Sequence, residues 1–380
     1  MKIYLLYEFL SEPGGLERLL INNANFLKEQ GHDVEILTCH LDKNIHNLLP
    51  FGDVKINSIS KFQTPFEFLN LLLCFLGLNN LSRYNPDLFI SYSFPCNYLI
   101  RNKNVQKIDY MNHFPHFLYF SQKEKIKWAS SSQGIKRWIS VIISWFLGGY
   151  LKKLDYKLVH LNSLVFTNSK FTKKIIDPIY NIKSIVSYPP LDEGFHPVKS
   201  RLRQKFIFSS GRIIPVKKYD WLIESLKYCK NKIPLYLSGA IEEGYKKQLL
   251  ELAEKNNVRV TFLGRLTTQK LIEYYSAAEV FVFPTPKFDF GLVVGESIAC
   301  GTPVVVWGDG GGQVEMVTNK INGFYAKPYD LRDYARKIDL IIDSKMKTKN
   351  HSKILNSALK FNVSTVKKGF IREINRVIKQ

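Results

Sequence analysis

The most constraining feature of the sequence is the stretch Phe281–Gly312, in which apolar runs alternate with a polar loop and a glycine run. It predicts a buried strand over residues 281–283, a loop, a short helix beginning near Leu292 and a second strand over residues 304–307. A succession of strand, loop, helix and strand is typical of parallel α/β units, whose ligands bind at the carboxyl ends of the strands.

The loop and helix of this stretch carry groups suited to a charged sugar ligand. Lys287 and Asp289 lie in the loop, and Glu296 lies about one turn into the helix. The first backbone N–H groups of a helix form a natural anion site, and a carboxylate accepts hydrogen bonds from hydroxyl groups. The stretch therefore predicts a site for a phosphorylated sugar.

The length and charge of the chain indicate two domains and an anionic partner. With 380 residues, 45% of them hydrophobic, the chain can bury a large core, and its length favours two domains. A formal net charge of +21 implies nucleic acid, a lipid surface or a phosphorylated substrate. The basic excess is concentrated in residues 345–380 and residues 122–157.

The cysteines and the amino terminus indicate the compartment. The five cysteines form no CxxC pair, which favours buried thiols in a reducing compartment over disulfides or a zinc site. We expect no cleaved leader, because Met1 and Lys2 lead straight into a strand-like run. No apolar run reaches the roughly 18 residues needed to span a bilayer. The sequence thus predicts a cytoplasmic protein.

The amino-terminal half opens as a Rossmann-like unit of strand, helix and strand over residues 2–37. The pair Gly14 and Gly15 lies where the helix begins, with Glu17 nearby. The GxGxxG fingerprint is missing, which argues against a dinucleotide cofactor. The glycine pair is either a plain turn or a ligand-facing start of the helix.

His113 is a second candidate in this half, since it follows a short apolar run and precedes a proline that ends regular structure. It is either a structural histidine or a loop residue presented to the cleft of a Rossmann-like domain. The proline-rich run 188–197 then marks the interdomain linker, and we place the boundary between residues 195 and 196.

Residues 122–157 combine basic side chains with tryptophans and an apolar run over residues 139–151. The run is too short to span a bilayer, but a basic and tryptophan-rich amphipathic segment suits a membrane-interface anchor. The alternative is a core helix with a solvated basic face. Because basic charge and indole rings coincide, we expect an anionic membrane surface as a partner.

The second half repeats the alternation of strands and helices and predicts a second doubly wound sheet over residues 196–362. Arg212 ends its first strand, and Lys217 stands just before the following helix. The two are either solvated loop cations or a pair that converges on one anion, and their layout favours a diphosphate site. A basic helix over residues 363–380 could pack back on the amino-terminal domain.

Taken in order, these motifs resemble the retaining GT-B glycosyltransferases of family four. The matching motifs are Gly14–Arg18, Thr167–Thr172, Tyr188–Pro190, Gly211–Arg212 with Lys217, Phe290–Leu292 with Glu296, and Gly301–Pro303. The resemblance covers nearly all of the chain. It implies an α/β fold of GT-B architecture, in which two Rossmann-like doubly wound domains, residues 1–195 and 196–362, face each other across a cleft.

The resemblance also implies roles for individual residues. The expected donor-binding residues are Gly14, Gly15, Arg212, Lys217, Asp289, Gly291, Leu292, Val293 and Glu296. The expected catalytic residues are His113, Arg212, Lys217 and Asp289, and the expected acceptor-binding residues are Glu17 and His113. In this scheme Arg212 and Lys217 clamp the donor diphosphate, and Glu296 holds the ribose hydroxyls. No metal and no cofactor are expected beyond the donor itself, a GDP-sugar or UDP-sugar.

One position departs from the family pattern. The family keeps a glutamate eight positions before Glu296, and this chain has Phe288 there. Asp289 is adjacent and could reach the same sugar hydroxyls with a shorter side chain. The departure bears on the donor sugar more than on the type of reaction.

The motifs GGLERL, HFP and YPPLD are similar to those of mannosyltransferases that extend lipid-linked oligosaccharides. The expected reaction is transfer of mannose or glucose, with retention, from a nucleotide diphosphate to a lipid-linked oligosaccharide or other membrane glycan, as in protein glycosylation. The enzyme would lie on the inner face of the cell membrane, with no nucleic-acid partner.

Three alternatives remain: a GT-B nucleotide-sugar epimerase, a nucleic-acid glucosyltransferase and a non-enzymatic sugar-binding protein. The charge of the chain permits the second. The Arg212–Lys217 pair argues against the third.

Overall fold

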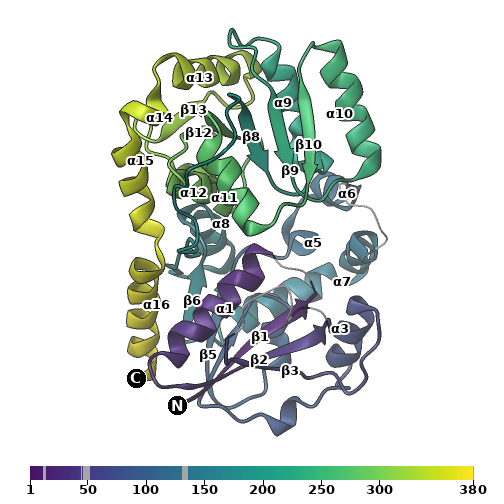
Figure 1. The fold of residues 1–380 in the computed structure, drawn as a ribbon. Coiled ribbons are helices and arrows are strands. Elements are labelled where there is room, and N and C mark those ends of the chain that lie inside the picture. The colour runs from purple at the N-terminus through teal and green to yellow at the C-terminus, as the bar shows by residue number, and fades with distance from the viewer. Residues whose placement is uncertain (12–13, 44, 46–51, 131–135, 380) are drawn as a thin grey trace. The chain divides into compact units, whose positions relative to one another are not determined.

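The computed structural model describes residues 1–11, 14–43, 45, 52–130 and 136–379. They form two compact units, each an α/β domain of Rossmann type built on a parallel sheet (Figure 1). Unit 1 comprises Met1–Tyr188 with Lys367–Gln380, and unit 2 comprises Pro189–Val366. The two doubly wound domains expected from the sequence are confirmed.

Unit 1 contains, in chain order, β1 (Lys2–Leu10), α1 (Gly15–Lys28), β2 (Asp33–Leu41), β3 (Lys55–Ser58), α3 (Glu67–Phe75), η1 (Leu81–Arg83), β4 (Leu88–Ser91), α4 (Cys96–Leu99), β5 (Gln106–Met111), α5 (His116–Tyr119), α6 (Gln122–Ser130), α7 (Lys136–Val159), β6 (Leu164–Thr167), α8 (Lys170–Tyr180) and β7 (Ile185–Val186). Its described strands form one sheet in the order β3-β2-β1-β4-β5-β6-β7, and each neighbouring pair is parallel.

The direction of the crossovers decides which helices cover which face of this sheet. The connection from β1 to β2 runs one way across the sheet, whereas those from β3 to β4 to β5 to β6 run the other way. Since such crossovers are right-handed, α1 covers one face, and α3, α4 and α5 to α7 cover the opposite face. The carboxyl-terminal helix α16 (Val363–Ile378) joins α1, where Phe370 packs against Phe26 with ring centroids 6.4 Å apart.

Unit 2 contains β8 (Ile207–Ser210), η2 (Pro215–Lys217), α9 (Tyr219–Leu226), β9 (Leu235–Ser238), α10 (Glu243–Lys255), β10 (Val260–Gly264), α11 (Thr268–Ala277), β11 (Val280–Phe283), α12 (Leu292–Ala299), β12 (Val304–Trp307), η3 (Gly312–Met316), β13 (Gly323–Ala326), α13 (Leu331–Asp343), α14 (Met346–Lys349), α15 (His351–Ala358) and η4 (Leu359–Phe361). Its described strands form one parallel sheet in the order β10-β9-β8-β11-β12-β13.

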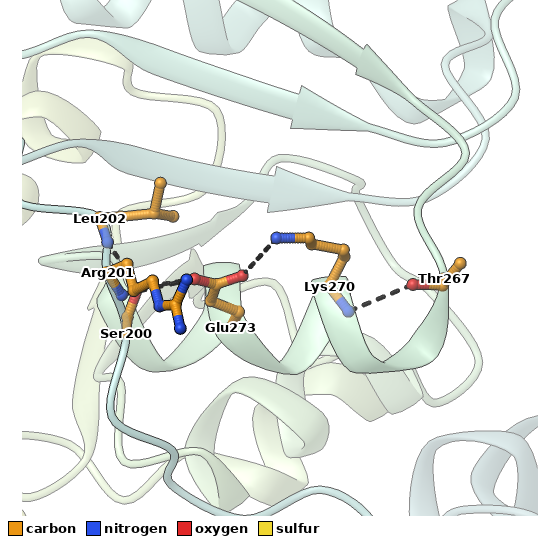
Figure 2. A network of polar contacts seen from close by, with 6 residues as sticks. All are labelled: Ser200, Arg201, Leu202, Thr267, Lys270 and Glu273. Carbon is orange, nitrogen blue, oxygen red and sulfur yellow. Dashed lines mark hydrogen bonds and ion pairs between the residues drawn. The ribbon is translucent and has the colours of Figure 1, made fainter.

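The segment that enters unit 2 is tied to α11 by a polar network (Figure 2). Glu273 lies at its centre: one carboxylate oxygen accepts from the Ser200 hydroxyl and from the Arg201 backbone N–H, and the other accepts from Lys270 at 2.9 Å. Thr267 caps the helix by accepting from the backbone N–H of Lys270. These contacts fix the position of α11, which carries a residue of the candidate site.

The unit boundaries fall after residues 188 and 366, where the sequence placed them after residues 195 and 362. The linker belongs to unit 2 because the backbone N–H of Leu191 donates to the carbonyl of Phe361 at 2.8 Å. The first four residues of α16 belong to unit 2, and the rest belongs to unit 1, where Lys367 pairs with Glu29.

Candidate functional site

Arg212 and Lys217 follow β8, at the carboxyl edge of the sheet of unit 2. The chain leaves β8 through Gly211, whose φ of +141° favours glycine. Gly239, at the end of β9, has a φ of +143°, and a side chain there would place its Cβ 1.9 Å from the carbonyl oxygen of Gly211. The two strand ends can approach this closely only because residue 239 is a glycine. Arg212 is exposed, and Lys217 is half-buried at the end of η2.

Lys217 lies in an aromatic and charged environment. Its Nζ is 3.5 Å from the ring centroid of Phe288 and 5.8 Å from that of Phe283. Burial and, to a lesser extent, the Arg212 guanidinium lower the pKa of Lys217 to about 7, and the Asp289 carboxylate opposes them. Arg212, Lys217, Phe288 and Asp289, which we call the Lys217 cluster, therefore meet at the carboxyl ends of β8 and β11.

The loop between β11 and α12, which carries half of this cluster, is held by side chains that follow β12. The Asp309 carboxylate accepts from the backbone N–H of Lys287 at 2.7 Å, and the Gln313 side-chain oxygen accepts from that of Phe288 at 3.1 Å. Gln313 also donates to Asp309 at 3.0 Å. Neither side chain was singled out in the sequence, because each acts on a loop about twenty residues earlier.

The glycine run Gly310–Gly312 lets the backbone of this loop come into close contact with the chain that follows β12. The backbone N–H of Gly312 donates to the carbonyl of Phe288 at 2.7 Å. A Cβ at Gly312 would lie 1.8 Å from the carbonyl oxygen of Asp289, and one at Gly311 would lie 2.8 Å from Cα of Lys287. A residue with a side chain at Gly312 would displace the backbone that presents Phe288 and Asp289.

The expected phosphate-binding backbone lies at the start of α12. Gly291 precedes the helix in the left-handed region, with a φ of +83°. Leu292 and Val293 form the first turn, where helix geometry supplies no carbonyl partner for the backbone N–H groups. These N–H groups are suited to an anion. The helix start expected near Leu292 is confirmed.

Glu296 lies in the second turn of α12 and is only 2% exposed. Its Oε2 accepts a hydrogen bond from the Tyr275 hydroxyl on α11 at 3.1 Å. The Tyr275 hydroxyl also lies 2.6 Å from the hydroxyl of Ser210, at the end of β8. Burial and the Glu296 carboxylate raise the pKa of Tyr275 well above its usual range. Tyr275 thus links the strand that precedes Arg212 to the helix that carries Glu296.

Sequence reasoning did not single out Tyr275 or Ser210. Tyr275 lies on a helix that precedes the glycine-rich stretch, and its spacing matches that of an ordinary core residue. Only the packing of α11 against α12 reveals its contact with Glu296.

In unit 1, Gly14, Gly15 and Glu17 gather at the start of α1, next to the end of β1. The Glu17 carboxylate folds back over the helix start, since a Cβ at Gly14 would lie 2.3 Å from Glu17 Oε2. Glu17 Oε1 accepts from the Tyr7 hydroxyl at 3.1 Å. Burial, together with the charge of Glu17, raises the pKa of the neighbouring Glu8 to about 7. The glycine pair therefore begins a helix, and Glu17 is held beside it.

His113 follows β5, at the same carboxyl edge of the sheet as the start of α1, with β4 between β1 and β5. It is exposed, and its ring centroid lies 5.3 Å from that of His116. Burial lowers the pKa of His116 to about 3, and the charges of His113 and Arg137 act in the same direction. His116 is thus neutral at physiological pH, while His113 faces solvent.

The segment 122–157 forms α6 and α7, and its residues 131–135 lie outside the part that the structure describes. Among the described residues, no helix combines the length and the apolar character needed to cross a bilayer. All five cysteines are buried free thiols, as expected from the sequence.

Residues 192–358 match the family described as "Glycosyl transferases group 1". The D-inositol 3-phosphate glycosyltransferase of Mycolicibacterium smegmatis is 33% identical over 144 residues, which cover 37% of this chain and only 33% of that protein. The N,N'-diacetylbacillosaminyl-diphospho-undecaprenol alpha-1,3-N-acetylgalactosaminyltransferase of Campylobacter jejuni is 29% identical over 62% of this chain and 65% of its own length.

The fold agrees with that of a solved structure over its whole length. Anabaena HepE, solved in complex with UDP and glucose, superposes with a TM-score of 0.75 at 20% identity, covering 99% of this chain and 100% of HepE. This likeness establishes the GT-B fold. The matches together show that the chain has the GT-B fold and that its residues 192–358 are similar to group 1 glycosyl transferases.

Proposed function

We propose that this enzyme transfers a hexose, mannose or glucose, with retention of configuration, from a nucleotide diphosphate to a hydroxyl of a lipid-linked glycan. The observation that carries the proposal is the Lys217 cluster. Two cations and a carboxylate meet there at the carboxyl ends of adjacent parallel strands, where α/β domains bind their ligands.

The leaving group of the reaction is a diphosphate, so stabilising its developing charge is the main catalytic requirement. Arg212 and Lys217 would bind its oxygens, together with the backbone N–H groups of Leu292 and Val293. Because the two side chains supply the positive charge, we propose that the reaction needs no metal ion. Glu296, presented by Tyr275, would accept hydrogen bonds from the ribose hydroxyls.

The remaining site residues would contact the sugar and the acceptor. Asp289 would accept a hydrogen bond from a hydroxyl of the transferred sugar, in place of the glutamate that Phe288 replaces. The backbone at Gly14 and Gly15 would approach the donor pyrophosphate. Glu17 and the exposed His113 would lie on the acceptor side, as the resemblance implies.

Two comparisons support the choice of substrates. HepE was solved with UDP and glucose, and the name of the C. jejuni relative describes an undecaprenol-linked acceptor. A lipid-linked acceptor calls for contact with a membrane, and the basic, tryptophan-containing helices α6 and α7 would supply it. The free cysteines fit a reducing compartment, so we place the enzyme on the inner face of the cell membrane.

A thermal-shift screen over nucleoside diphosphates and nucleotide sugars tests the donor side of the proposal. We expect the melting temperature of the wild-type enzyme to rise with either UDP-sugars or GDP-sugars, because a ligand that binds only the folded state stabilises it. Arg212→Ala and Lys217→Ala should abolish the rise. A rise that persists in both variants, or no rise with any nucleotide, would refute the site.

A further inference from the structure

Exposed apolar side chains of unit 1 gather on two helices, α3 and α7. On α3 and its flanking residues they are Phe62, Phe66, Leu69, Leu72, Leu76 and Leu78, and on α7 they are Ile142, Ile143, Trp145, Phe146, Leu147 and Tyr150. Phe146 is 82% exposed, and Leu76 is 70% exposed. Scattered exposed apolar residues are ordinary, but contiguous groups of this kind mark interaction sites.

The middle of helix α7 has the reverse of the polarity expected for a helix that faces water. Its buried residues are Val141, Ser144, Gly148 and Asp155 along the middle of the helix, and Leu158 and Val159 at its end. Asp155 accepts from the hydroxyls of Tyr119 at 2.8 Å and Tyr180 at 2.6 Å. Between residues 142 and 155, the side of the helix that faces the protein thus carries small or polar residues. Ser144 accepts from Lys125 there, and Asp155 accepts from the two tyrosines, while the bulky apolar side chains of this part face outward. A water-facing helix would present the opposite pattern.

Helix α3 presents a second apolar face. Leu69, Leu72 and Leu76 are three or four residues apart and therefore lie on one side of the helix. Asn70 and Cys74, which are buried, face the protein, and the Asn70 amide nitrogen lies 2.7 Å from Nδ1 of His40. This polar contact on the inner side fixes the rotation of α3, so its leucines are held outward.

The two helices belong to one surface. Both cover the same face of the sheet, because the crossovers that contain them run in the same direction. Phe75 of α3 stacks on Tyr98 of α4, with ring centroids 4.1 Å apart, and α4 packs against α7. We call the exposed apolar residues of α3 and α7, with those that flank α3, the α3–α7 surface.

Basic side chains border this surface. Lys123 and Lys127 are exposed on α6, and Lys152, Lys153 and Lys157 are exposed on α7. The Trp145 indole N–H donates to the Gln122 side chain at 2.7 Å, which ties the start of α6 to the apolar face of α7. Bulky apolar residues and a tryptophan beside lysines match the boundary between acyl chains and anionic headgroups.

We propose that the α3–α7 surface docks on an anionic lipid bilayer, with α3 and α7 both entering the boundary between headgroups and acyl chains. The proposal deepens the proposed function, on which it rests for the membrane acceptor, by adding α3 to the contact. The segment 122–157 then supplies the charge and one apolar face, and α3 supplies the other.

Vesicle flotation of the full chain tests this surface, using vesicles of phosphatidylglycerol with phosphatidylcholine and vesicles of phosphatidylcholine alone. We expect binding to the anionic vesicles at low salt. The α3 variant Leu69→Gln/Leu72→Gln/Leu76→Gln and the α7 variant Phe146→Gln/Leu147→Gln should each bind about tenfold more weakly or worse, because each removes apolar area from the interface. Lys152→Glu/Lys153→Glu should show a similar loss of binding. Raising the salt concentration should weaken the binding of the wild type in the same way, because salt screens the charges.

The matched control is Leu250→Gln/Leu340→Gln, which changes two exposed leucines of unit 2 and should bind as the wild type does. All variants should keep the wild-type melting temperature, because the changed side chains are exposed. If the α3 triple variant does not fold, the single change Leu72→Glu replaces it and should weaken binding in the same way.

Three results would overturn the proposal. The wild type could fail to bind anionic vesicles at low salt, or the α3 variant could bind as the wild type does. Alternatively, the wild type could form a dimer in light scattering that the same substitutions disperse, which would make the surface an interface between copies. Vesicle binding requires neither donor nor acceptor. A protein that binds vesicles but has no transferase activity would therefore contradict only the proposed function, and one that has activity but does not bind vesicles would contradict only the proposed surface.

Discussion

At the scale of single residues, Lys217 is the most informative side chain of the candidate site. Its amine lies against the Phe288 ring in partly buried surroundings near Arg212, and its pKa falls to about 7. The departure from the family pattern therefore has a visible consequence: an aromatic ring covers the lysine proposed to hold the diphosphate. An anion bound beside Lys217 would favour the charged amine and raise its pKa again.

The affinity for an intact nucleotide sugar should consequently depend on pH. Binding takes up a proton when the pH exceeds the pKa of free Lys217, so the dissociation constant should be about tenfold higher at pH 8 than at pH 6. A nucleotide sugar suits this titration because its diphosphate diester does not titrate in that range. Calorimetry at both pH values measures the effect.

Lys217→Arg is the matched control for this titration, because arginine stays charged over the whole range. Its affinity should change little between pH 6 and pH 8. If the affinity of the wild type also changed little between pH 6 and pH 8, Lys217 would not be the group that takes up the proton.

Asp289→Asn tests whether Asp289 replaces the glutamate missing at Phe288. If its carboxylate binds a sugar hydroxyl, affinity for the nucleotide sugar should fall by roughly tenfold or more, since hydrogen bonds to charged groups contribute about 1.5–3 kcal/mol. Affinity for the nucleoside diphosphate, which lacks the sugar, should fall less. An equal loss for both ligands would assign Asp289 to the electrostatics of Lys217 alone.

At the scale of elements, the site depends on a loop held against a glycine run. Gly312→Ala would place a Cβ 1.8 Å from the carbonyl oxygen of Asp289, which the loop can avoid only by moving. We expect donor affinity to fall at least tenfold, because the displaced loop carries Phe288 and Asp289. Binding of a nucleotide sugar, with the melting temperature as a check on folding, measures the effect.

Gly244→Ala is the matched glycine control. A Cβ there meets nothing within 4 Å, and Gly244 lies in α10, where alanine stabilises by about 0.5–1 kcal/mol. This variant should bind donor as the wild type does. If Gly312→Ala also bound normally, the close approach of the loop would have no part in donor binding.

The sequence predicted the elements whose signal is local. The strands over residues 281–283 and 304–307 and the helix that begins near Leu292 were all expected, because each is a short apolar run next to a glycine or a polar loop. The edge strand β3, Lys55–Ser58, was missed, because its side chains are mostly polar and its pairing with β2 supplies the order.

The remaining features of the site and surface needed the tertiary structure. The ring of Phe288 reaches Lys217 from a different strand end, and Tyr275 reaches Glu296 from a neighbouring helix. No spacing in the sequence encodes these contacts. Likewise, only the exposure of Leu69, Leu72 and Leu76 in the structure shows that these leucines face outward.

At the scale of the whole molecule, each unit carries its own share of the proposed chemistry. Most residues proposed to bind the diphosphate and the ribose lie in unit 2. The residues proposed to meet the acceptor lie in unit 1, which also carries the α3–α7 surface. This division predicts that a nucleotide contacts mainly unit 2, whereas an acceptor and its lipid contact unit 1. Substitutions in the Lys217 cluster should therefore leave vesicle binding unchanged.

Transfer of radiolabelled sugar from nucleotide donors into the lipid-extractable fraction of membranes tests the central claim most directly. We predict that the wild-type enzyme labels this fraction with at least one UDP-sugar or GDP-sugar. Arg212→Ala and Lys217→Ala should each lower the rate by about a hundredfold or more, because each removes a charge from the leaving-group site. Wild-type rates in both variants, or labelling by neither class of donor, would contradict the account.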